Sequence, residues 1–248
     1  MSSSIFVHLL PGLFEPAELV GGVAVVLDVL RATSTIVYAL AAGVKAVIPC
    51  GEIDDARRIA AQSPPGTVLL GGERHGLKIS GFDLGNSPTD YTPPAVAGKT
   101  LIFTTTNGTR ALIRARAARR VLVGAFLNLG AVVRLLANET GPVHIVCAGT
   151  DGQVTLEDVL CAGAIAHGLG SQGIETEASD DSTQLALNLF ETCGRDYNSL
   201  VTTLRQSRGG RNLIDCSLGA DIFTCAQQDK FEIVPELALA AWEIHAAL

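Results

Sequence analysis

Short apolar runs alternate with helix-like segments along most of this 248-residue chain. The run Gly22–Leu30 is rich in Val and almost continuously apolar, which is typical of a strand buried on both faces of a sheet. The segment that follows, Arg31–Gly43, has Ser and Thr where a helix would begin and Gly where it would end. The recurring order of strand, polar loop and helix predicts an α/β fold with a mostly parallel sheet and helices on both faces.

The same reasoning predicts the other elements. Strands are expected at Ile5–Leu10, Val44–Cys50, Thr67–Glu73, Lys99–Thr106, Arg120–Phe126 and Pro142–Gly149, with a short one at 231–237. Helices are expected at 53–62, 107–118, 129–138, 156–169, 183–193 and 198–206, and over the last dozen residues. The length fits a single domain over residues 1–248 or two lobes that share a core, with a boundary between 125 and 142 as the alternative.

The composition limits the class of protein. Hydrophobic residues make up 48% of the chain and charged residues 17%, which suffices for a packed interior. The net charge of −7 argues against a nucleic-acid partner, whereas a locally basic site for a small anionic metabolite is still compatible with it. No apolar run approaches the ~20 residues of a membrane-spanning helix, and the N-terminus lacks the pattern of a secretory signal. We therefore expect a cytoplasmic protein with no membrane partner, and leave open whether it is a homo-oligomer.

The six cysteines contain no CxxC pair, and several stand in apolar surroundings. A disulfide framework is not expected in a chain of this length without a secretion signal, and the spacing does not suit a structural zinc site. The six are expected to be buried, reduced thiols.

Carboxylate, guanidinium and hydroxyl side chains follow four of the predicted strands. Ligands of parallel sheets bind beyond the carboxyl ends of the strands, so these side chains are expected to meet in one pocket. They are Asp28 and Arg31 at the end of the strand Gly22–Leu30, Glu73, Arg74 and His75 at the end of Thr67–Glu73, Thr106–Arg110 at the end of Lys99–Thr106, and Asp151, Glu157 and Asp158 after Pro142–Gly149.

The segment TTTNGTR suits an anion. Gly108 permits close approach of the backbone to a ligand, and a helix that begins near Asn107 offers free N–H groups and the positive end of its dipole. Arg110 can add a bidentate clamp on phosphate or sulfonate. The alternative is that Thr106 or Asn107 serves only as the N-cap of the helix.

The carboxylates allow two interpretations. Asp28 is either a metal ligand or nucleophile, or it caps the helix that follows. The Asp-x-Asp motif of the aspartyl-phosphate phosphatases is absent, because Leu30 stands where the second acid is required. Glu157 and Asp158 follow Thr155 as in a capping box, although either can still reach a metal. Mg²⁺ binds a few carboxylates together with water and substrate oxygens, and two or three of these acids can supply them.

Two further segments are rich in Gly and polar residues. Gly81–Pro93 is either a solvated loop or a loop that covers the substrate with Asn86 and Ser87 as donors. Residues 206–213 carry Arg208 and Arg211 beside two glycines, which suits an anion or a flexible surface turn. His75 can act as an acid or base, although an isolated His usually does not.

Seven segments together resemble the 2-phosphosulfolactate phosphatase family. They are DVLRATST (Asp28–Thr35), LLGGER (Leu69–Arg74), GFDLGNSP (Gly81–Pro88), TTTNGTRA (Thr104–Ala111), LEDVLCAG (Leu156–Gly163), RGGRNL (Arg208–Leu213) and LGADIFTCA (Leu218–Ala226). The resemblance implies a Mg²⁺-dependent phosphatase that hydrolyses 2-phospho-3-sulfolactate to 3-sulfolactate and phosphate, a step toward coenzyme M. Such a substrate carries phosphate, carboxylate and sulfonate groups.

These considerations lead to a specific hypothesis. Asp28 and Glu73 are the expected catalytic residues, and the metal ligands are drawn from Asp28, Glu73, Glu157 and Asp158. Attack by water and attack by Asp28 itself both remain open. The expected substrate-binding residues are Arg31, Arg74, Thr106, Asn107, Gly108, Thr109, Arg110 and Arg211. The rival hypotheses are a non-catalytic binding protein for a phosphorylated or sulfonated acid, and a phosphoryl-transferring enzyme.

Overall fold

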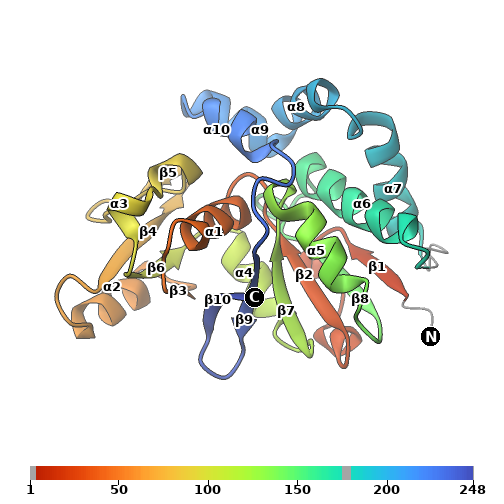
Figure 1. Cartoon of the computed structure of the whole chain (residues 1–248). Coiled ribbons are helices and arrows are strands. Elements are labelled where there is room, and N and C mark those ends of the chain that lie inside the picture. The colour runs from red at the N-terminus through yellow and green to blue at the C-terminus, as the bar shows by residue number, and fades with distance from the viewer. Residues whose placement is uncertain (1–3, 175–179, 248) are drawn as a thin grey trace.

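The structure, a computed structural model, describes residues 4–174 and 180–247. In this part of the chain ten strands form one sheet, in the order β1-β8-β2-β7-β9-β10-β3-β6-β4-β5 (Figure 1). The predicted mostly parallel α/β sheet is confirmed. The strands are β1 (Ile5–His8), β2 (Val23–Leu27), β3 (Ala46–Pro49), β4 (Val68–Arg74), β5 (Leu77–Lys78), β6 (Thr100–Thr104), β7 (Arg120–Gly124), β8 (Val143–Cys147), β9 (Val234–Ala238) and β10 (Glu243–Ala247).

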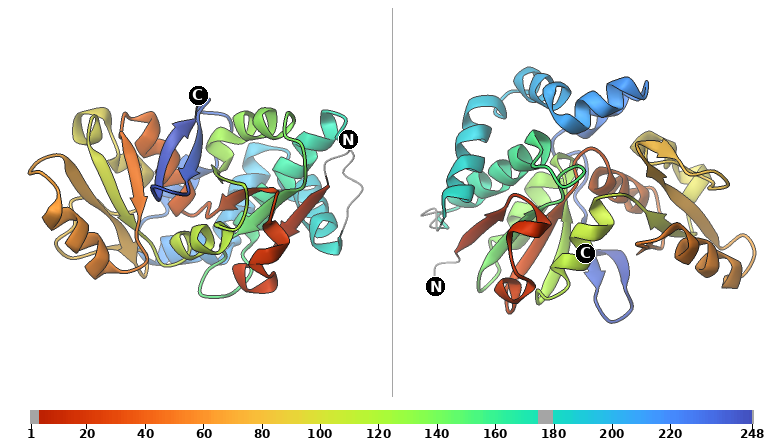
Figure 2. Two further views of the ribbon diagram at one scale, coloured as in Figure 1. Left: turned by 90° about the horizontal axis from the view of Figure 1, so that it is seen from below. Right: turned by 180° about the vertical axis from the view of Figure 1, so that it is seen from behind.

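Helices cover both faces of this sheet (Figure 2). Both faces of strand β2 are apolar and buried. Val23, Val25 and Leu27 belong to one core cluster, together with residues of α5, α6 and α8. Ala24 and Val26 belong to a second cluster on the opposite face, together with residues of α1 and α4. The helices are α1 (Ala32–Ala41), α2 (Ile53–Gln62), α3 (Pro93–Val96), α4 (Gly108–Ala115), α5 (Leu129–Leu136), α6 (Leu156–Ser171), α7 (Asp181–Cys193), α8 (Tyr197–Gln206), α9 (Arg208–Asp215) and α10 (Ala220–Cys225).

The end of the chain differs from the prediction. The short strand expected at 231–237 is confirmed as β9. The helix expected over the last dozen residues is wrong, because β10 forms an antiparallel hairpin with β9 instead. The Ala- and Leu-rich sequence favours a helix, but Ile244 pairs with Val47 of β3 and Leu237 is buried in the core, and such tertiary pairing overrides propensity. Trp242 adopts a positive φ of 57° in the connecting turn, and its indole N–H bonds to the carbonyl of Pro49.

The hairpin divides the parallel strands into two sets. One set is β1-β8-β2-β7, and the other, β3-β6-β4, is contributed by residues between β2 and β7 in the sequence. The two sets lie on either side of the hairpin in Figure 1. In the ladder register Leu122 of β7 pairs with Glu236 of β9, and Ile244 of β10 pairs with Val47 of β3. The antiparallel hairpin therefore links two groups of parallel strands into one sheet.

Residues 125–142 contain α5, which packs against α6. The single domain over residues 1–248, with a lobe boundary in that stretch as the alternative, stays a prediction. None of the helices in the described ranges combines the length and apolar character that crossing a bilayer requires.

The cysteines only partly match their prediction. All six are free thiols, and Cys50, Cys147, Cys161 and Cys225 are buried. Burial raises the pKa of the Cys225 thiol to about 12, so this group is unreactive near neutral pH. Cys193 and Cys216 are only half-buried, so the prediction of burial is wrong for these two. Cys193 is the last residue of α7, and Cys216 directly follows α9. Both helices carry exposed residues along one side.

Candidate active site

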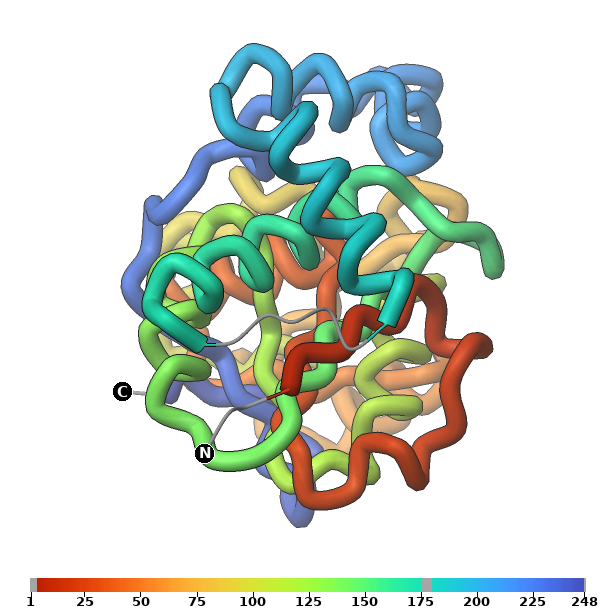
Figure 3. Tube along the Cα trace, turned by 90° about the vertical axis from the view of Figure 1, so that its right-hand side faces the viewer, coloured from red at the N-terminus to blue at the C-terminus, as the bar shows by residue number. Residues whose placement is uncertain are grey.

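A cavity of about 300 Å³ opens where the two sets of parallel strands meet α9. Its lining comes from segments far apart in the sequence, including α9, which lies among the blue helices at the top of Figure 3. The lining residues include Asp28 and Arg31 after β2, Glu73 one residue before the end of β4, Thr106 and Asn107 after β6, Thr150 and Asp151 after β8, and Gly209 and Asn212 of α9. The predicted convergence of side chains from several strand ends is therefore observed, although the strands belong to two sets rather than to one parallel sheet.

Asp28 lies between the N-termini of two helices. Its Oδ1 accepts a hydrogen bond of 3.1 Å from the backbone N–H of Ala32, the first residue of α1. Gly108, the first residue of α4, is so close that a Cβ there would stand 2.9 Å from Asp28 Oδ2 and 2.8 Å from Ala32 Cβ. Gly108 therefore permits a close approach, as predicted, but of Asp28 and α1 rather than of the substrate directly.

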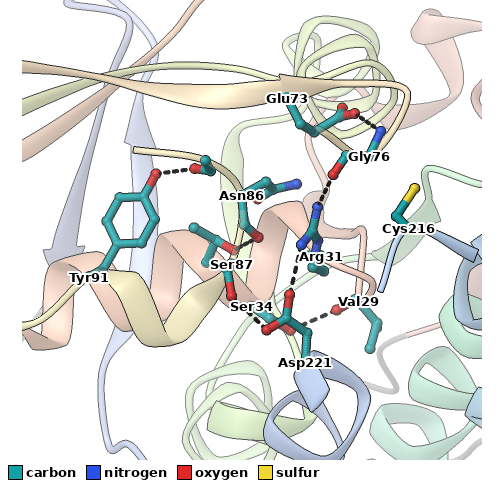
Figure 4. Close-up of polar contacts among 12 residues, drawn as sticks. Val29, Arg31, Ser34, Glu73, Gly76, Asn86, Ser87, Tyr91, Cys216 and Asp221 are labelled. Atoms are coloured by element: carbon teal, nitrogen blue, oxygen red, sulfur yellow. Dashed lines mark hydrogen bonds and ion pairs between the residues drawn. The ribbon is translucent and has the colours of Figure 1, made fainter. Parts of the chain in front are cut away.

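Glu73 ties two edges of the cavity together. Its Oε1 accepts from the backbone N–H of Thr106 at 2.8 Å, and its Oε2 accepts from the backbone N–H of Gly76 at 2.7 Å. Figure 4 shows the second of these bonds, across the turn between β4 and β5. Each carboxylate oxygen thus fixes one loop at the rim, and Glu73 itself is only 7% exposed.

Asp158 does not form the predicted capping box. Its Oδ1 accepts from the backbone N–H of Val29 at 2.8 Å, and its Oδ2 accepts from that of Gly149 at 2.9 Å. The side chain of Thr155, the N-cap residue of α6, makes no capping bond to the helix. The capping interpretation is wrong because the segments after β2 and β8 offer unpaired N–H groups that compete for this carboxylate. Asp158 fixes the distance between those segments and does not line the cavity.

Glu157 lies behind the cavity wall. It is 2% exposed, and its Oε1 packs so closely against Gly209 that a Cβ at that position would collide with it. Its Oε2 is buried and has no hydrogen-bond partner among the described residues. A buried oxygen without a partner is rare and indicates a group that the chain itself does not supply.

The electrostatics of these acids are unusual. The pKa of Asp28 is raised to about 7, mainly by burial and also by the nearby charges of Glu73 and Glu157, while hydrogen bonds from Ala32 and Gly108 oppose the increase. Burial also raises the pKa values of Glu157 and Asp158. Within the described ranges, no Lys or Arg forms an ion pair with any of the four acids. The cluster therefore lacks a counter-charge.

The arginines are distributed differently from the prediction. Arg31 lines the cavity, 3% exposed, and pairs with Asp221 at 2.7 Å. Arg74 turns to the other face of β4, where it bonds to Thr104 Oγ1 at 2.9 Å, as the alternation of side chains along a strand requires. Arg110 and Arg211 are exposed and do not line the cavity. Of the four arginines expected to bind substrate, only Arg31 lines the cavity.

The segment after β6 contributes polar groups. Thr106 and Asn107 both line the cavity, and the hydroxyl of Thr106 is buried with no partner among the described residues. Asn107 is the N-cap residue of α4 but makes no capping bond through its side chain, and its Oδ1 instead accepts from the N–H of Asp151 at 3.3 Å. Thr109 is buried in the first turn of α4 beside Thr105 and does not line the cavity.

Helix α9 supplies the residues that sequence reasoning missed. The interpretation of residues 206–213 as a flexible turn is wrong, because Ser207 caps α9 by accepting from the N–H of Gly210 at 3.0 Å. Asn212, Asp215 and Cys216 then line the cavity at helical spacing, and His75 and Gly76 line it from the β4–β5 turn. The spacing of three and four residues is the signal that could have identified the α9 residues.

The loop Gly81–Pro93 is packed rather than solvated over its second half. Asn86 is 5% exposed and Tyr91 is 2% exposed, with the Tyr91 hydroxyl donating to the carbonyl of Gly85 at 2.7 Å. Asn86 also lines the cavity (Figure 4). The Gly and Pro residues therefore occur in tight turns that pack against α1, and Pro88–Asp90 form the short helix η3. That this loop covers the substrate stays a prediction.

The cavity wall is acidic overall. Asp28, Glu73, Asp151 and Asp215 line it, and Arg31 is the one Lys or Arg side chain in the described part of its wall. Across the described ranges, no three His, Cys, Asp or Glu side chains are grouped closely enough to hold a metal by themselves. A Mg²⁺ ion needs fewer, since it is usually bound by one or two carboxylates together with water and substrate phosphate.

The comparison with known families decides the relationship. The family model described as 2-phosphosulpholactate phosphatase matches residues 9–239. The chain belongs to the 2-phosphosulfolactate phosphatase family. The family predicted from the seven segments is thereby confirmed, and the match includes every residue discussed above as lining the cavity.

Relatives in this family are similar over most of their length. A protein of Caldanaerobacter subterraneus subsp. tengcongensis is 43% identical over 213 residues, which cover 86% of each chain. One of Symbiobacterium thermophilum is 43% identical over 218 residues, 88% of this chain and 92% of the relative. One of Trichormus variabilis is 39% identical over 235 residues, which cover 93% of this chain and 94% of the relative. Each is named a probable 2-phosphosulfolactate phosphatase.

Proposed function

We propose that this protein hydrolyses 2-phospho-3-sulfolactate to 3-sulfolactate and phosphate with the help of Mg²⁺. Membership of the phosphatase family and the names of the relatives support the reaction. The observation that carries the proposal is the cluster of buried acids without a counter-charge beside a cavity of metabolite size. A substrate with three acidic groups cannot enter such a cavity favourably unless a cation neutralises the wall.

The donor set fits Mg²⁺. Asp28 and Glu73 present hard carboxylate oxygens at the cavity, and the acidic wall leaves room for water and phosphate oxygens to complete the coordination. Glu157 would act from behind Gly209 as a further negative charge, and Asp158 would hold the loops that carry Asp28. When bound, Mg²⁺ supplies charge neutralisation at the phosphoryl oxygens and lowers the pKa of a coordinated water.

The residues of the chain have distinct roles in this proposal. The hydroxyl of Thr106, which is buried without a partner, donates to a phosphoryl oxygen, and Asn107 lies next to it at the N-terminus of α4. Arg31 contacts an acidic group of the substrate. Ionised Asp28 either accepts the proton of the attacking water or attacks phosphorus itself. In both routes the ester P–O bond breaks, the C2 oxygen leaves as a hydroxyl group after taking up a proton, and water supplies the new phosphate oxygen.

The setting of the reaction is also a proposal. The six free thiols are consistent with a reducing compartment, and we place the protein in the cytoplasm, acting on a small anionic metabolite in a pathway toward coenzyme M. The acidic net charge of −7 argues against a nucleic-acid partner. A homo-oligomer is compatible with all of these proposals.

The decisive assay measures phosphate release from 2-phospho-3-sulfolactate. We expect release with Mg²⁺, loss of at least about 100-fold in excess EDTA, and full recovery when Mg²⁺ is added back. Release that ignores EDTA would contradict the metal dependence. No release from any phosphorylated hydroxy acid would favour the non-catalytic binding protein, and phosphate transfer to an added alcohol would reveal a transferase. Radiolabelled substrate distinguishes the two routes, because only attack by Asp28 leaves label on the protein.

A further inference from the structure

A buried carboxylate outside the cavity joins two segments of its wall. Asp221 of α10 is 4% exposed and does not line the cavity. Its Oδ2 pairs with Arg31 Nη1 at 2.7 Å, and its Oδ1 accepts from the Ser87 hydroxyl at 2.6 Å (Figure 4). The Asp221 side chain therefore fixes both Arg31, in the segment that follows β2, and the loop that precedes η3.

Arg31 is held but not saturated by these contacts. Its Nη2 donates to the carbonyl of Gly76 at 2.7 Å, so the bonds to Asp221 and Gly76 use two of the five N–H donors of a guanidinium group. Arg31 lines the cavity, and its remaining N–H groups have no hydrogen-bond partner among the described residues. A guanidinium oriented in this way is suited to an oxyanion such as carboxylate or sulfonate.

Asn86 stands beside Arg31 on the same wall. Its backbone carbonyl accepts from the Thr35 hydroxyl at 2.9 Å, and Ser87, the next residue, is bonded to Asp221. The Asn86 side chain is more than nine-tenths buried, and its Oδ1 has no hydrogen-bond partner among the described residues. Figure 4 shows the amide nitrogen directed toward Arg31. An anion cannot satisfy Oδ1, which only accepts. The amide nitrogen, for which the described residues provide no acceptor, is the atom that can donate to an oxyanion in the cavity.

We propose that Arg31 and Asn86, positioned by Asp221, form a subsite for one of the two acidic groups that remain on the substrate, the sulfonate rather than the carboxylate. This inference rests on the proposed function, and in the proposed substrate the group is the sulfonate. The acids Asp28 and Glu73 line the remainder of the cavity and would repel a sulfonate, whereas the wall of Arg31 and Asn86 presents donors. In this proposal Arg31 and Asn86 contact the group that determines specificity, and Asp28 and Glu73 act on the reacting phosphoryl group.

The test compares two substrates with Mg²⁺ present. We expect Asn86→Ala to lower kcat/KM about 10–100-fold on 2-phospho-3-sulfolactate, mainly through KM, because a hydrogen bond to a charged group is lost. On 2-phospholactate, which lacks the sulfonate, kcat/KM should change by less than about threefold. Asn138→Ala serves as the control, because Asn138 is exposed and bonds only to the carbonyl of Arg134. Equal losses on both substrates would overturn the subsite.

A second measurement keeps this inference separate from the proposed function. If the unaltered protein hydrolyses neither substrate, the proposed function fails, and the subsite is then judged by calorimetric binding of 3-sulfolactate and of lactate. Weaker binding of 3-sulfolactate by Asn86→Ala, with lactate unaffected, supports the subsite. Identical binding of 3-sulfolactate by the variant and the unaltered protein overturns it.

Asp221 is a positioning residue in this account. Asp221→Asn retains the shape of the side chain and an oxygen that can accept from Ser87, but removes the charge opposite Arg31. We expect the preference for the sulfonated over the unsulfonated substrate to fall at least about fivefold, through KM. A lower melting temperature with an unchanged preference would show that Asp221 is only structural.

Discussion

Replacing Asp28 with Asn is expected to reduce phosphate release at least about a thousandfold while it stabilises the metal-free protein above pH 7. Activity is lost because Asn can neither accept a proton nor attack phosphorus, and it is a weaker ligand for Mg²⁺. Stability rises because the charge of Asp28 is buried near Glu73 and Glu157 with no cation beside it. A gain in stability together with a loss of activity distinguishes a functional carboxylate from one that stabilises the fold.

The sign of the pH effect follows from the direction of the shift. The pKa of Asp28 is about 7 in the folded protein against an ordinary value of 3.8. The folded state therefore binds this proton more tightly, and the destabilisation by the ionised group develops as the pH rises between these values. It is complete above pH 7 and amounts to about 4 kcal/mol at most. The advantage of Asp28→Asn should be small at pH 4 and largest at pH 8.

Urea denaturation in EDTA at these two pH values measures the effect. Asp54→Asn is the matched control, since the side chain of Asp54 is 96% exposed and forms only a long ion pair with Arg57. Its stability relative to the unaltered protein should hardly change with pH. Two results would contradict the role given to Asp28. One is an Asp28→Asn protein that retains a tenth of the activity. The other is a free energy of unfolding whose gain over the unaltered protein does not grow with pH.

Glu73→Gln is expected to lower kcat/KM about 100-fold. Both carboxylate oxygens of Glu73 accept backbone N–H groups, from Thr106 and from Gly76. A glutamine has one such oxygen, so its NH₂ group faces one of the two donors and displaces that loop from the cavity rim. The exposed residue Glu52, whose side chain makes no capping bond to α2, provides the control Glu52→Gln.

The same variant carries a second, independent readout. The charge of Glu73 raises the pKa of Asp28, so removing it lowers that pKa. The pH dependence of unfolding in EDTA that arises from Asp28 should therefore move to lower pH in Glu73→Gln and stay in place in Glu52→Gln. A shift to higher pH would contradict the proximity of the two carboxylates.

Much of this architecture is predictable from local patterns. The continuous apolar run around Val25 predicts a strand buried on both faces, and polar residues after several strands predict where the cavity lies. Asp28, Glu73 and Asn107 line one cavity, as expected, because each stands directly after or at the end of a strand. In these cases, position along the chain alone determines the location of the residue.

Other features depend on contacts that local patterns do not contain. The last dozen residues have helical composition, yet they form β10, which pairs with the predicted strand β9 and with the edge that β3 offers. Asp158 resembles a helix cap but bonds to Val29 and Gly149, which are adjacent only in the folded chain. The sequence predicts Arg31 as a substrate-binding residue but gives no sign of its partner Asp221, which is 190 residues away along the chain.

The central claim is that Asp28 retains a proton until a cation takes its place. Calorimetric titration of the metal-free protein with Mg²⁺, in buffers of different ionisation enthalpy, counts the protons released on binding. Below the Asp28 pKa of about 7, at pH 6, we predict release of about one proton per ion, falling toward zero at pH 8.5, and none from Asp28→Asn at either pH. Mg²⁺ binding that releases equal numbers of protons from both proteins, or no binding at all, would contradict the account.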